Sequence, residues 1–315
     1  NATAAFTARN FGLVSAFVRT LLRTGLLLNK IAGPNTMLGL TKQVKKLRPD
    51  FPLWSNLVLP PPATVHAPAR QSAFTRSIVY FPTCISRVMG NYAGKEKNSM
   101  ESFLSVCRKS RVNVILPPKL QSLCCSQVYS SKGYQDAYRI KANEVVSALW
   151  SVTENGKWPV VLDVSSCTHT LKQVEPVLDA ENKQKFRQLT IWDAVEFLYH
   201  QVIPTAVPAT RKKDIVLHPV CSLTKMNIYY MLRSVAAHFA DQVTVPASAG
   251  CCGMAGDRGF IVPGLTASAT QTEAVEVCSA NYDGHYSTTK TCEIALSQST
   301  NRNYESILYL ADECL

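Results

Sequence analysis

Two pairs of adjacent cysteines constrain this chain more than any other feature of its sequence. Cys124-Cys125 lies in SLCCSQVYSSKGY, and Cys251-Cys252 lies in SAGCCGMAGDRGF. Adjacent cysteines rarely form a disulfide with each other, because the bridge strains the peptide bond between them. A chain of 315 residues that is 46% hydrophobic can bury a core and does not need disulfides for stability. The pairs therefore indicate thiolate ligands or reactive thiols, and their recurrence indicates an internal repeat.

The repeat includes one further cysteine on each side of each pair. Each copy opens with a β-branched run, a proline and a cysteine, in SIVYFPTC and DIVLHPVC, and closes in DVSSC and STTKTC. The opening cysteine and the pair are separated by 39 residues in the first copy and 29 in the second. The pair and the closing cysteine are separated by 41 and 39 residues. The eight matching positions are Cys84, Cys124, Cys125, Cys167, Cys221, Cys251, Cys252 and Cys292. Cys107, Cys278 and Cys314 have no counterparts and are expected to pack as small hydrophobic residues.

Short apolar runs alternate with helical stretches in both copies. SIVYFP, VNVILPP, WPVVLDV, KDIVLHP and QVTVPA are typical of strands, whereas YQDAYRIKANEVVSALWSV and TKMNIYYMLRSVAAHF are typical of helices. The alternation predicts two α/β units with mainly parallel sheets, in residues 77–210 and 211–315. Loops that follow parallel strands meet at one edge of the sheet, so the four cysteines of each copy are expected to converge there. Cys292 alone has no obvious strand before it.

Residues 1–76 differ from the repeats in charge. They hold ten Lys or Arg against Asp50 alone, a balance of +9 out of +11 for the chain. NFGLVSAFVRTLLRTGLLLNKIAG predicts an amphipathic helix that presents Arg19 and Arg23 on one side. Its opposite, apolar face is expected to contain Phe11, Val14, Val18, Leu21 and Leu22. The longest uncharged run in this segment is nine residues, which argues against a transmembrane span.

Two roles are open for this basic section. It meets anionic lipid or an acidic partner, or it docks on its own repeats with its arginines in water. RPDFPLWSNLVLPPPATVHAPARQ is expected to be an extended, proline-stiffened connector. Residues 1–76 are predicted to lie against a partner chain or a membrane face, and a contact of Pro60 to Pro68 with another subunit would support this role.

The cysteine pattern, given twice, resembles the cysteine-rich (CCG) region of heterodisulfide reductase. It also resembles that of the glycolate oxidase iron–sulfur subunit and that of FAD-linked iron–sulfur D-lactate dehydrogenases. HYSTTKTCEIALS and YESILYLADECL resemble the tail of the last family, and LRPDFPLWSNLVLPPPA resembles the segment before its cysteine-rich region. The resemblance implies an iron–sulfur electron-transfer module of a respiratory D-2-hydroxy-acid (D-lactate) dehydrogenase.

The same resemblance implies partners and a location. Electrons would pass from FAD, on a flavoprotein partner or an upstream section, towards quinone or cytochrome c. The module would belong to a membrane respiratory complex or lie at an anionic membrane surface. That membrane would be the mitochondrial inner membrane, on its matrix side, in a eukaryote, and otherwise the cytoplasmic face of the plasma membrane. No nucleic-acid partner is expected.

The chain departs from the family pattern in two respects. In heterodisulfide reductase each repeat ends in CxxC, but here Val164 and Thr289 stand at the first cysteine of that motif. Four thiolates per copy fit one [4Fe–4S] cubane or one tetrahedral zinc ion, so the eight repeated cysteines are the predicted metal ligands. The chain also shows no flavin domain and no CxxCxxCxxxCP segment, so hydride abstraction is expected elsewhere, and no catalytic residue is assigned.

Other interpretations of the cysteines remain open. Zinc or empty sites would make the chain an accessory or assembly subunit of a respiratory complex without redox chemistry. A thiol–disulfide enzyme would need an exposed cysteine of low pKa. Candidate substitute ligands or proton relays are His169, His218 and His285. Asp257 and Arg258 are expected to tune the second site through charge. Because Gly253 permits the positive φ that Ser126 disfavours, the second site is predicted to be better occupied by metal and more sensitive to substitution.

Overall fold

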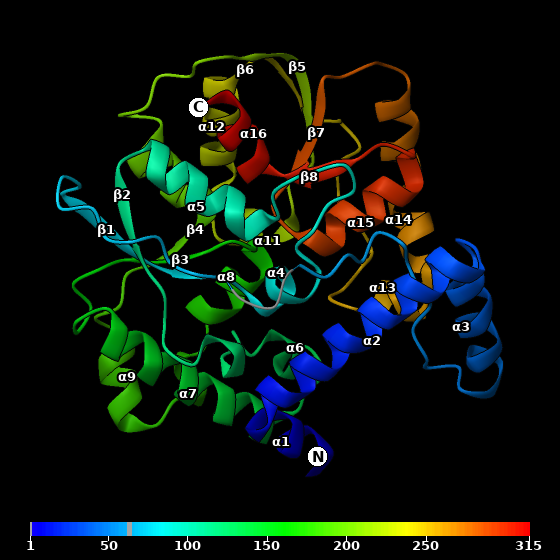
Figure 1. The fold of residues 1–315 in the computed structure, drawn as a ribbon, viewed down its shortest axis with the longest axis horizontal. Helices are drawn as coiled ribbons and strands as arrows, with labels where there is room; N and C mark the ends of the chain where they lie inside the picture. Colours follow the sequence, from blue (N-terminus) through cyan, green and yellow to red (C-terminus); the bar gives the residue numbers. More distant parts are fainter. Residues whose placement is uncertain (1, 62–64) are drawn as a thin grey trace.

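The fold contains two four-stranded sheets that share one topology. The computed structural model describes residues 2–61 and 65–315. The first sheet comprises β1 (Arg76–Phe81), β2 (Val112–Ile115), β3 (Val160–Leu162) and β4 (Ile191–Asp193), in the order β2-β1-β3-β4. The second comprises β5 (Lys212–Leu217), β6 (Ala240–Thr244), β7 (Gly284–Ser287) and β8 (Tyr304–Ser306), in the order β6-β5-β7-β8. All neighbouring strands pair in parallel (Figure 1). The predicted pair of α/β units is confirmed, and the repeat of the cysteines is also a repeat of strand order.

The central strands are apolar because helices cover both faces of each sheet. Ile78 to Phe81 and all of β3 are buried, as expected of parallel strands between helical layers. The helices of the first unit are α4 (Cys84–Met89), α5 (Ser99–Lys109), η1 (Leu120–Ser122), α6 (Gln127–Ser130), α7 (Gln135–Val152), α8 (Ser165–Lys172), η2 (Glu175–Val177), α9 (Ala180–Phe186), α10 (Ala194–Phe197) and η3 (Leu198–Val202). Those of the second are α11 (Cys221–Lys225), α12 (Tyr229–Phe239), α13 (Arg258–Ile261), α14 (Pro263–Cys278), α15 (Lys290–Thr300) and α16 (Ile307–Cys314). In each sheet the second strand lies on one side of the first strand, and the third strand lies on the other side. The strand order therefore reverses between β1 and β3 and between β5 and β7, and these places are the topological switch points of the sheets.

Three strands were not predicted from the sequence. They are β4, β7 and β8, each only three or four residues long. The strand before Cys292 that the sequence did not reveal is β7, GHYS. It has no apolar run that would predict a strand, because its first two residues are the half-buried Gly284 and His285. A predicted helix is also divided, because Asn227 adopts a φ of 57° between α11 and α12.

The two units pack together through reciprocal contacts. The largest buried cluster joins Phe103 and Phe197 of the first unit with Leu232 and Leu310 of the second. Helix α4 contacts α15 while its equivalent α11 contacts α8, and α5 contacts α16 while α12 contacts α10. At the centre, Ser165 N donates to Thr288 O at 3.1 Å. Each of these helix contacts thus has a counterpart with the units exchanged, as in a two-fold symmetric dimer.

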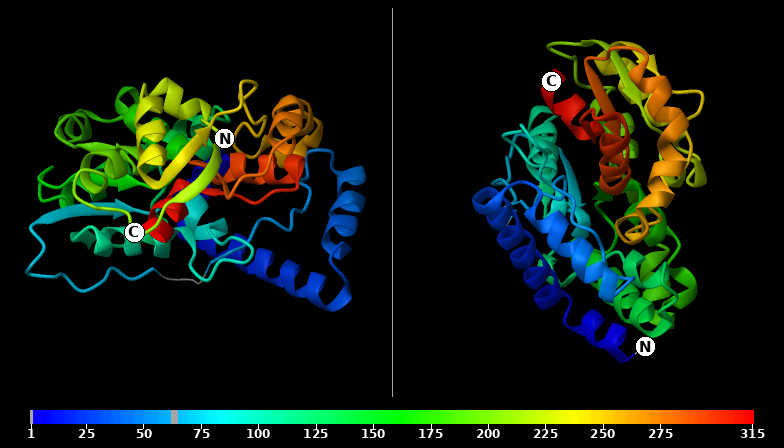
Figure 2. Two further views of the ribbon diagram at one scale, coloured as in Figure 1. Left: turned by 90° about the horizontal axis from the view of Figure 1, so that it is seen from above. Right: turned by 90° about the vertical axis from the view of Figure 1, so that its right-hand side faces the viewer.

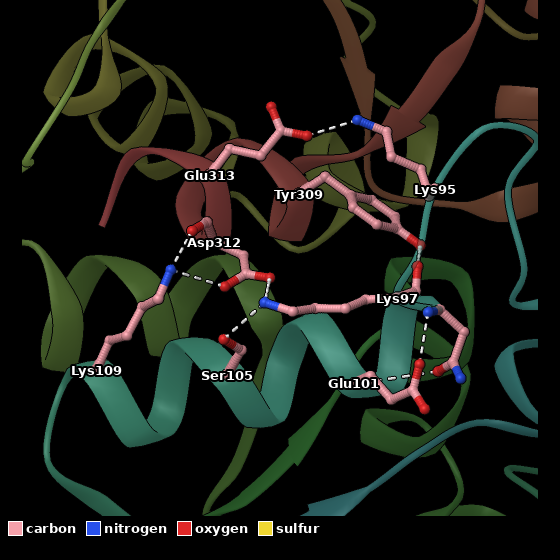
Figure 3. Close-up of polar contacts among 9 residues, drawn as sticks. Lys95, Lys97, Glu101, Ser105, Lys109, Tyr309, Asp312 and Glu313 are labelled. Atoms are coloured by element: carbon pink, nitrogen blue, oxygen red, sulfur yellow. Dashed lines mark hydrogen bonds and ion pairs between the residues drawn. The ribbon is translucent and has the colours of Figure 1, made fainter.

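Lysines of the first unit form ion pairs with α16, which packs against α5, as Figure 3 shows. Asp312 accepts from Lys97 Nζ at 2.8 Å and from Lys109 Nζ at 3.0 Å. Glu313 pairs with Lys95 Nζ at 2.5 Å, and Tyr309 Oη donates to Lys97 O at 2.8 Å. The carboxylate of Asp312 is 6% exposed, so these ion pairs are partly shielded from solvent.

The N-terminal helices α1 (Ala2–Arg9), α2 (Phe11–Ala32) and α3 (Thr36–Leu47) lie along one edge of this body (Figure 2). The predicted apolar face of α2 is divided, since Val18 and Leu21 are exposed whereas Phe11 is buried, and Arg19 is only 7% exposed instead of lying in water. Arg19 Nη2 lies 3.5 Å and Arg23 Nη2 2.7 Å from Pro61 O, so both arginines bind the connector of their own chain. The side of α2 that faces the protein is therefore not the one its hydrophobic pattern predicts, because the guanidinium groups of Arg19 and Arg23 donate to the Pro61 carbonyl.

Helix α2 is also the one helix within residues 2–61 and 65–315 that is long and apolar enough to cross a membrane. An 18-residue window has a mean hydropathy of 1.5 and is 17% buried. Its short uncharged run therefore does not exclude a span by itself. The predicted contact of Pro60–Pro68 with another subunit falls partly on residues 62–64, which lie outside the described residues. Pro60 O accepts from Asn91 Nδ2 at 3.1 Å within the chain.

Candidate functional site

The cysteines that open and close each repeat occupy equivalent helix positions. Cys84 and Cys221 are the first residues of α4 and α11, directly after β1 and β5. Cys167 and Cys292 are the third residues of α8 and α15, after β3 and β7. Free backbone N–H groups and the positive end of the helix dipole surround such positions, and both favour thiolates.

The cysteine pairs follow β2 and β6 and end in the same backbone turn. Ser126 and Gly253, the residues after the pairs, have φ angles of 76° and 72°. In the first repeat this turn directs Ser126 N–H to Cys124 Sγ, at 3.4 Å. The two loops therefore present their cysteines with the same local geometry, although only one of them contains glycine.

The first repeat forms a buried centre. Cys84 Sγ and Cys124 Sγ lie 3.9 Å apart, and Cys124, Cys125 and Cys167 are almost completely buried. The hydrogen bond with Cys124, together with burial, raises the pKa of Cys84 well above its usual value. The interaction with Cys125 raises the pKa of Cys124 to about 12. These thiols are therefore neutral unless a cation stabilises their charge.

The second repeat forms an open centre. All four of its cysteines line a cavity of about 680 Å³. Cys221 and Cys251 are exposed, whereas Cys252 and Cys292 are buried. The hydrogen bond from the Cys292 thiol lowers the pKa of Cys252 to about 7 and raises that of Cys292. The two centres thus differ in accessibility, although their cysteines are placed in the same way.

The two centres are neighbours across the interface between the units. The cavity of the first, about 230 Å³, contains Cys84, Cys125 and Cys167 in its lining. Residues that line both cavities are Ile85, Gln127, Ser131, Gly256, Asp257 and Thr291. Lys132 of the first unit pairs with Asp257 of the second at 2.7 Å. The switch points of both sheets therefore face a common region of the molecule.

Arg87, which the sequence did not single out, is a buried cation beside the first centre. It lies on α4, one turn after Cys84, and is 2% exposed. Its guanidinium donates to Leu120 O at 2.6 Å and to Leu123 O, immediately before the cysteine pair. Its charge also favours the Cys84 thiolate. The second repeat has Thr224 at this position, so only the first centre has a fixed buried arginine.

Asp163 is a second residue that sequence reasoning missed, at the end of β3. Its carboxylate accepts from Tyr80 Oη at 2.6 Å and from Thr83 N at 3.0 Å. It therefore joins the loop that carries Cys84 to the loop that carries Cys167. Burial raises the pKa of Asp163. A lone Asp after a strand gave no signal in the sequence beyond its place in DVSSC.

The candidate histidines do not gather with the cysteines as one group. His218, fully buried, accepts or donates through Nδ1 to Glu273 at 2.8 Å, and it lies close enough to Cys252 to influence its pKa. His169 lies on α8, and burial lowers its pKa. His285 is in β7, where burial and Arg302 lower its pKa to about 4. Of the predicted charges, Asp257 and Arg258 both line the second cavity.

The cysteines fit a multi-iron cluster in number and donor type. Within the part of the chain that the structure describes, no three His, Cys, Asp or Glu side chains are arranged to hold a single metal ion. A single zinc ion needs all its ligands around one point, whereas each iron of a cubane takes one thiolate. Each set of four cysteines therefore supplies the donors that metal or iron–sulfur binding needs.

Fold and site together define an α/β protein with two cysteine-lined centres. Residues 78–172 match the family of CCG cysteine-rich domains. The match runs from β1 to the end of α8 and includes the four repeated cysteines of the first unit. No curated protein matches the chain. The first unit is therefore similar to a cysteine-rich domain of a kind compatible with metal or iron–sulfur binding, and strand order relates the second unit to it.

Proposed function

We propose that this chain is an iron–sulfur electron-transfer module of a respiratory FAD-linked D-2-hydroxy-acid (D-lactate) dehydrogenase. The observation that carries the proposal is the presence of two equivalent sets of four cysteines at the switch points of two parallel sheets. The cavities of the two sets share walls, so two redox groups bound there would be close enough for electrons to move between them.

Residues of this chain would hold and tune such groups. Cys84, Cys124, Cys125 and Cys167 would bind one [4Fe–4S] cluster, and their second-unit equivalents would bind the other. A bound cluster supplies one-electron transfer. Arg87 offsets the negative charge of four thiolates in the first centre, and Phe11 and Val14 of α2 limit the access of water to it. The raised thiol pKa values mean that binding of a cation must release protons.

The open second centre is the proposed entry for electrons. Cys221 and Cys251 are exposed there, whereas the first centre is closed. A flavoprotein partner, or a flavin section of a longer protein, would dock over this cavity. The acceptor would be quinone or cytochrome c, in a complex at the mitochondrial inner membrane or the bacterial plasma membrane.

The test is the metal content of anaerobically purified protein. We expect a brown protein with broad absorption near about 400 nm and roughly eight irons per chain, four for each centre. Cys124→Ser and Cys251→Ser should each remove about half of the iron. Cys278→Ser, at an exposed cysteine outside the repeat, is the matched control and should keep all of it. Iron-free wild-type protein, purified without oxygen, would overturn the proposal.

A zinc-stabilised accessory or assembly subunit is the second candidate function, and one distance favours it. The 3.9 Å between Cys84 Sγ and Cys124 Sγ is close to the roughly 3.8 Å edge of a tetrahedron with Zn–S bonds of about 2.3 Å. Thiolates on different irons of a cubane lie further apart. A colourless protein with stoichiometric zinc would support this function in place of electron transfer.

A further inference from the structure

Helix α2 carries its apolar side outwards. Besides Val18, six large apolar residues on it are exposed, namely Leu13, Phe17, Leu21, Leu27, Leu28 and Ile31. At 3.6 residues per turn they fall within an arc of about 120°, and we call them the outer stripe. No charged residue lies within this arc. The inner side of the helix instead holds the polar or small residues Ser15, Arg19, Gly25 and Asn29.

The inner side is fixed by specific contacts, so the helix cannot simply rotate to bury its stripe. Asn29 Nδ2 donates to Asn56 Oδ1, and Asn29 Oδ1 accepts from Met37 N, both at 2.8 Å. A Cβ at Gly25 would lie 2.4 Å from the ring of Trp54, so this close approach requires glycine. The outward orientation of the stripe is therefore built into the packing of α2 against α3 and the connector.

The surroundings of the stripe are basic. Residues 1–49 contain no Asp or Glu. Arg9, Lys30, Lys42 and Lys46 are exposed on the three N-terminal helices, as is the aromatic ring of Phe6. An apolar helix face flanked by cations is the arrangement that binds at the headgroup level of an anionic bilayer. The 18-residue hydropathy of α2 is consistent with insertion of that face.

We propose that the outer stripe of α2 docks on an anionic lipid surface, with the helix parallel to the membrane. The apolar side chains enter the boundary between headgroups and acyl chains, and the flanking lysines and arginines contact lipid phosphates. The inner side stays on the protein, where Phe11, Val14 and Val18 line the cavity of the first centre. The membrane would therefore lie about one helix diameter, roughly 10 Å, from that centre.

Sedimentation with vesicles tests the proposal on the full chain. We expect binding to phosphatidylcholine vesicles that contain phosphatidylglycerol, and at least about tenfold weaker binding to pure phosphatidylcholine. Phe17→Ser combined with Leu21→Ser should weaken binding by about tenfold or more. Lys30→Gln should weaken it about fivefold, and high salt should do the same to the wild type. None of these residues is part of a cysteine centre, so a failure here leaves the proposed function intact.

The matched control is Val207→Ser with Val275→Ser, which removes two exposed apolar side chains elsewhere on the surface. These changes should leave vesicle binding unaltered. Circular dichroism should show that all variants keep the fold. A concentration-dependent dimer that Phe17→Ser with Leu21→Ser abolishes, without vesicle binding, would overturn the proposal in favour of a second copy. Binding to neutral vesicles that resists alkaline extraction would overturn it in favour of a membrane-spanning helix, and a monomer that binds no vesicles would overturn it outright.

Discussion

Ser126 and Gly253 hold the same left-handed turn behind the two cysteine pairs, at φ angles of 76° and 72°. The turn is therefore a requirement of the fold rather than a consequence of glycine. Ser126 meets this requirement at a cost, because its Cβ disfavours the left-handed region and its buried hydroxyl has no hydrogen-bond partner. Both backbones adopt the conformation, so Gly253 lowers the cost of the turn without deciding whether it forms, and the better occupancy of the second centre stays a prediction.

We predict that Ser126→Gly stabilises the protein. Removing the Cβ from a left-handed residue relieves roughly 1 kcal/mol, and removing an unpaired buried hydroxyl adds to this gain. Chemical denaturation of the metal-free protein should show a higher midpoint. A lower midpoint would contradict the view that Ser126 is strained.

The reciprocal change, Gly253→Ala, should destabilise the protein by about 2 kcal/mol or more. A Cβ there would lie 2.5 Å from Leu265 O, and the positive φ adds strain. Gly264→Ala is the matched control: it lies in α14, no atom comes within 4 Å of its Cβ position, and alanine favours the helix. The same denaturation experiment should show a small gain for this control.

Arg87→Met should destabilise the first unit by about 2 to 4 kcal/mol, because it leaves the carbonyls of Leu120 and Leu123 without their donor. If the centres bind metal, the first should lose its share while the second keeps its own. Thr224→Val, at the equivalent place in the second repeat, should have little effect on either quantity. Unfolding curves and metal analysis together check the prediction, and an unchanged unfolding free energy for Arg87→Met would refute it.

Asp312→Ala should weaken the interface between the two units. It leaves Lys97 and Lys109 without the shielded carboxylate that both contact, at a cost of about 2 to 3 kcal/mol (Figure 3). Asp50→Ala is the control, because Asp50 and Arg48 form a fully solvent-facing ion pair worth under about 1 kcal/mol. Thermal melts should separate the two variants. Equal melting temperatures would mean that the α5–α16 contacts contribute little.

His285 should make the protein sensitive to mild acid. Burial, assisted by Arg302, lowers its pKa to about 4, whereas the unfolded chain titrates near about 6.5. Between these values the unfolded state binds more protons, so stability falls as the pH falls from about 6.5 to 4 and then levels off. The loss attributable to His285 is up to about 3 kcal/mol. Unfolding free energies of His285→Gln should depend less on pH in this window, and an identical pH profile would reject the assignment.

The strand pattern and the cysteine spacing were sufficient to predict the architecture. β3 and the second halves of β1 and β5 are apolar runs because helices cover both their faces, so their sequences alone identify these strands. β7 escaped prediction because Gly284 and His285, which are only half-buried, occupy its first half. The positions of Cys167 and Cys292 followed from the alternation of strands and helices, even without a visible strand before the second.

The orientation of α2 and the role of Arg87 were beyond the sequence. The predicted apolar face of α2 shares only Leu21 with the outer stripe, because a sequence pattern cannot state which side of a helix meets protein and which lies open. Arg19 is buried and Arg23 is held beside it because a single carbonyl, that of Pro61, accepts from both. Arg87 similarly owes its place to carbonyls 33 and 36 residues away, a long-range pairing with no local signature.

The reciprocal contacts between the two units have an evolutionary consequence. Helices α8 and α15 occupy equivalent places in the two units, as do α10 and α16. A single unit with this surface would pair with a copy of itself through the contact seen between α4 and α15 and the contact seen between α5 and α16, each formed twice. The chain therefore has the form of a duplicated and fused homodimer. A true homodimer must keep its two centres identical, since one gene encodes both. Fusion would remove that constraint and let the halves differ, as they do at Arg87 and Thr224 and in the exposure of Cys221 and Cys251 compared with Cys84 and Cys124.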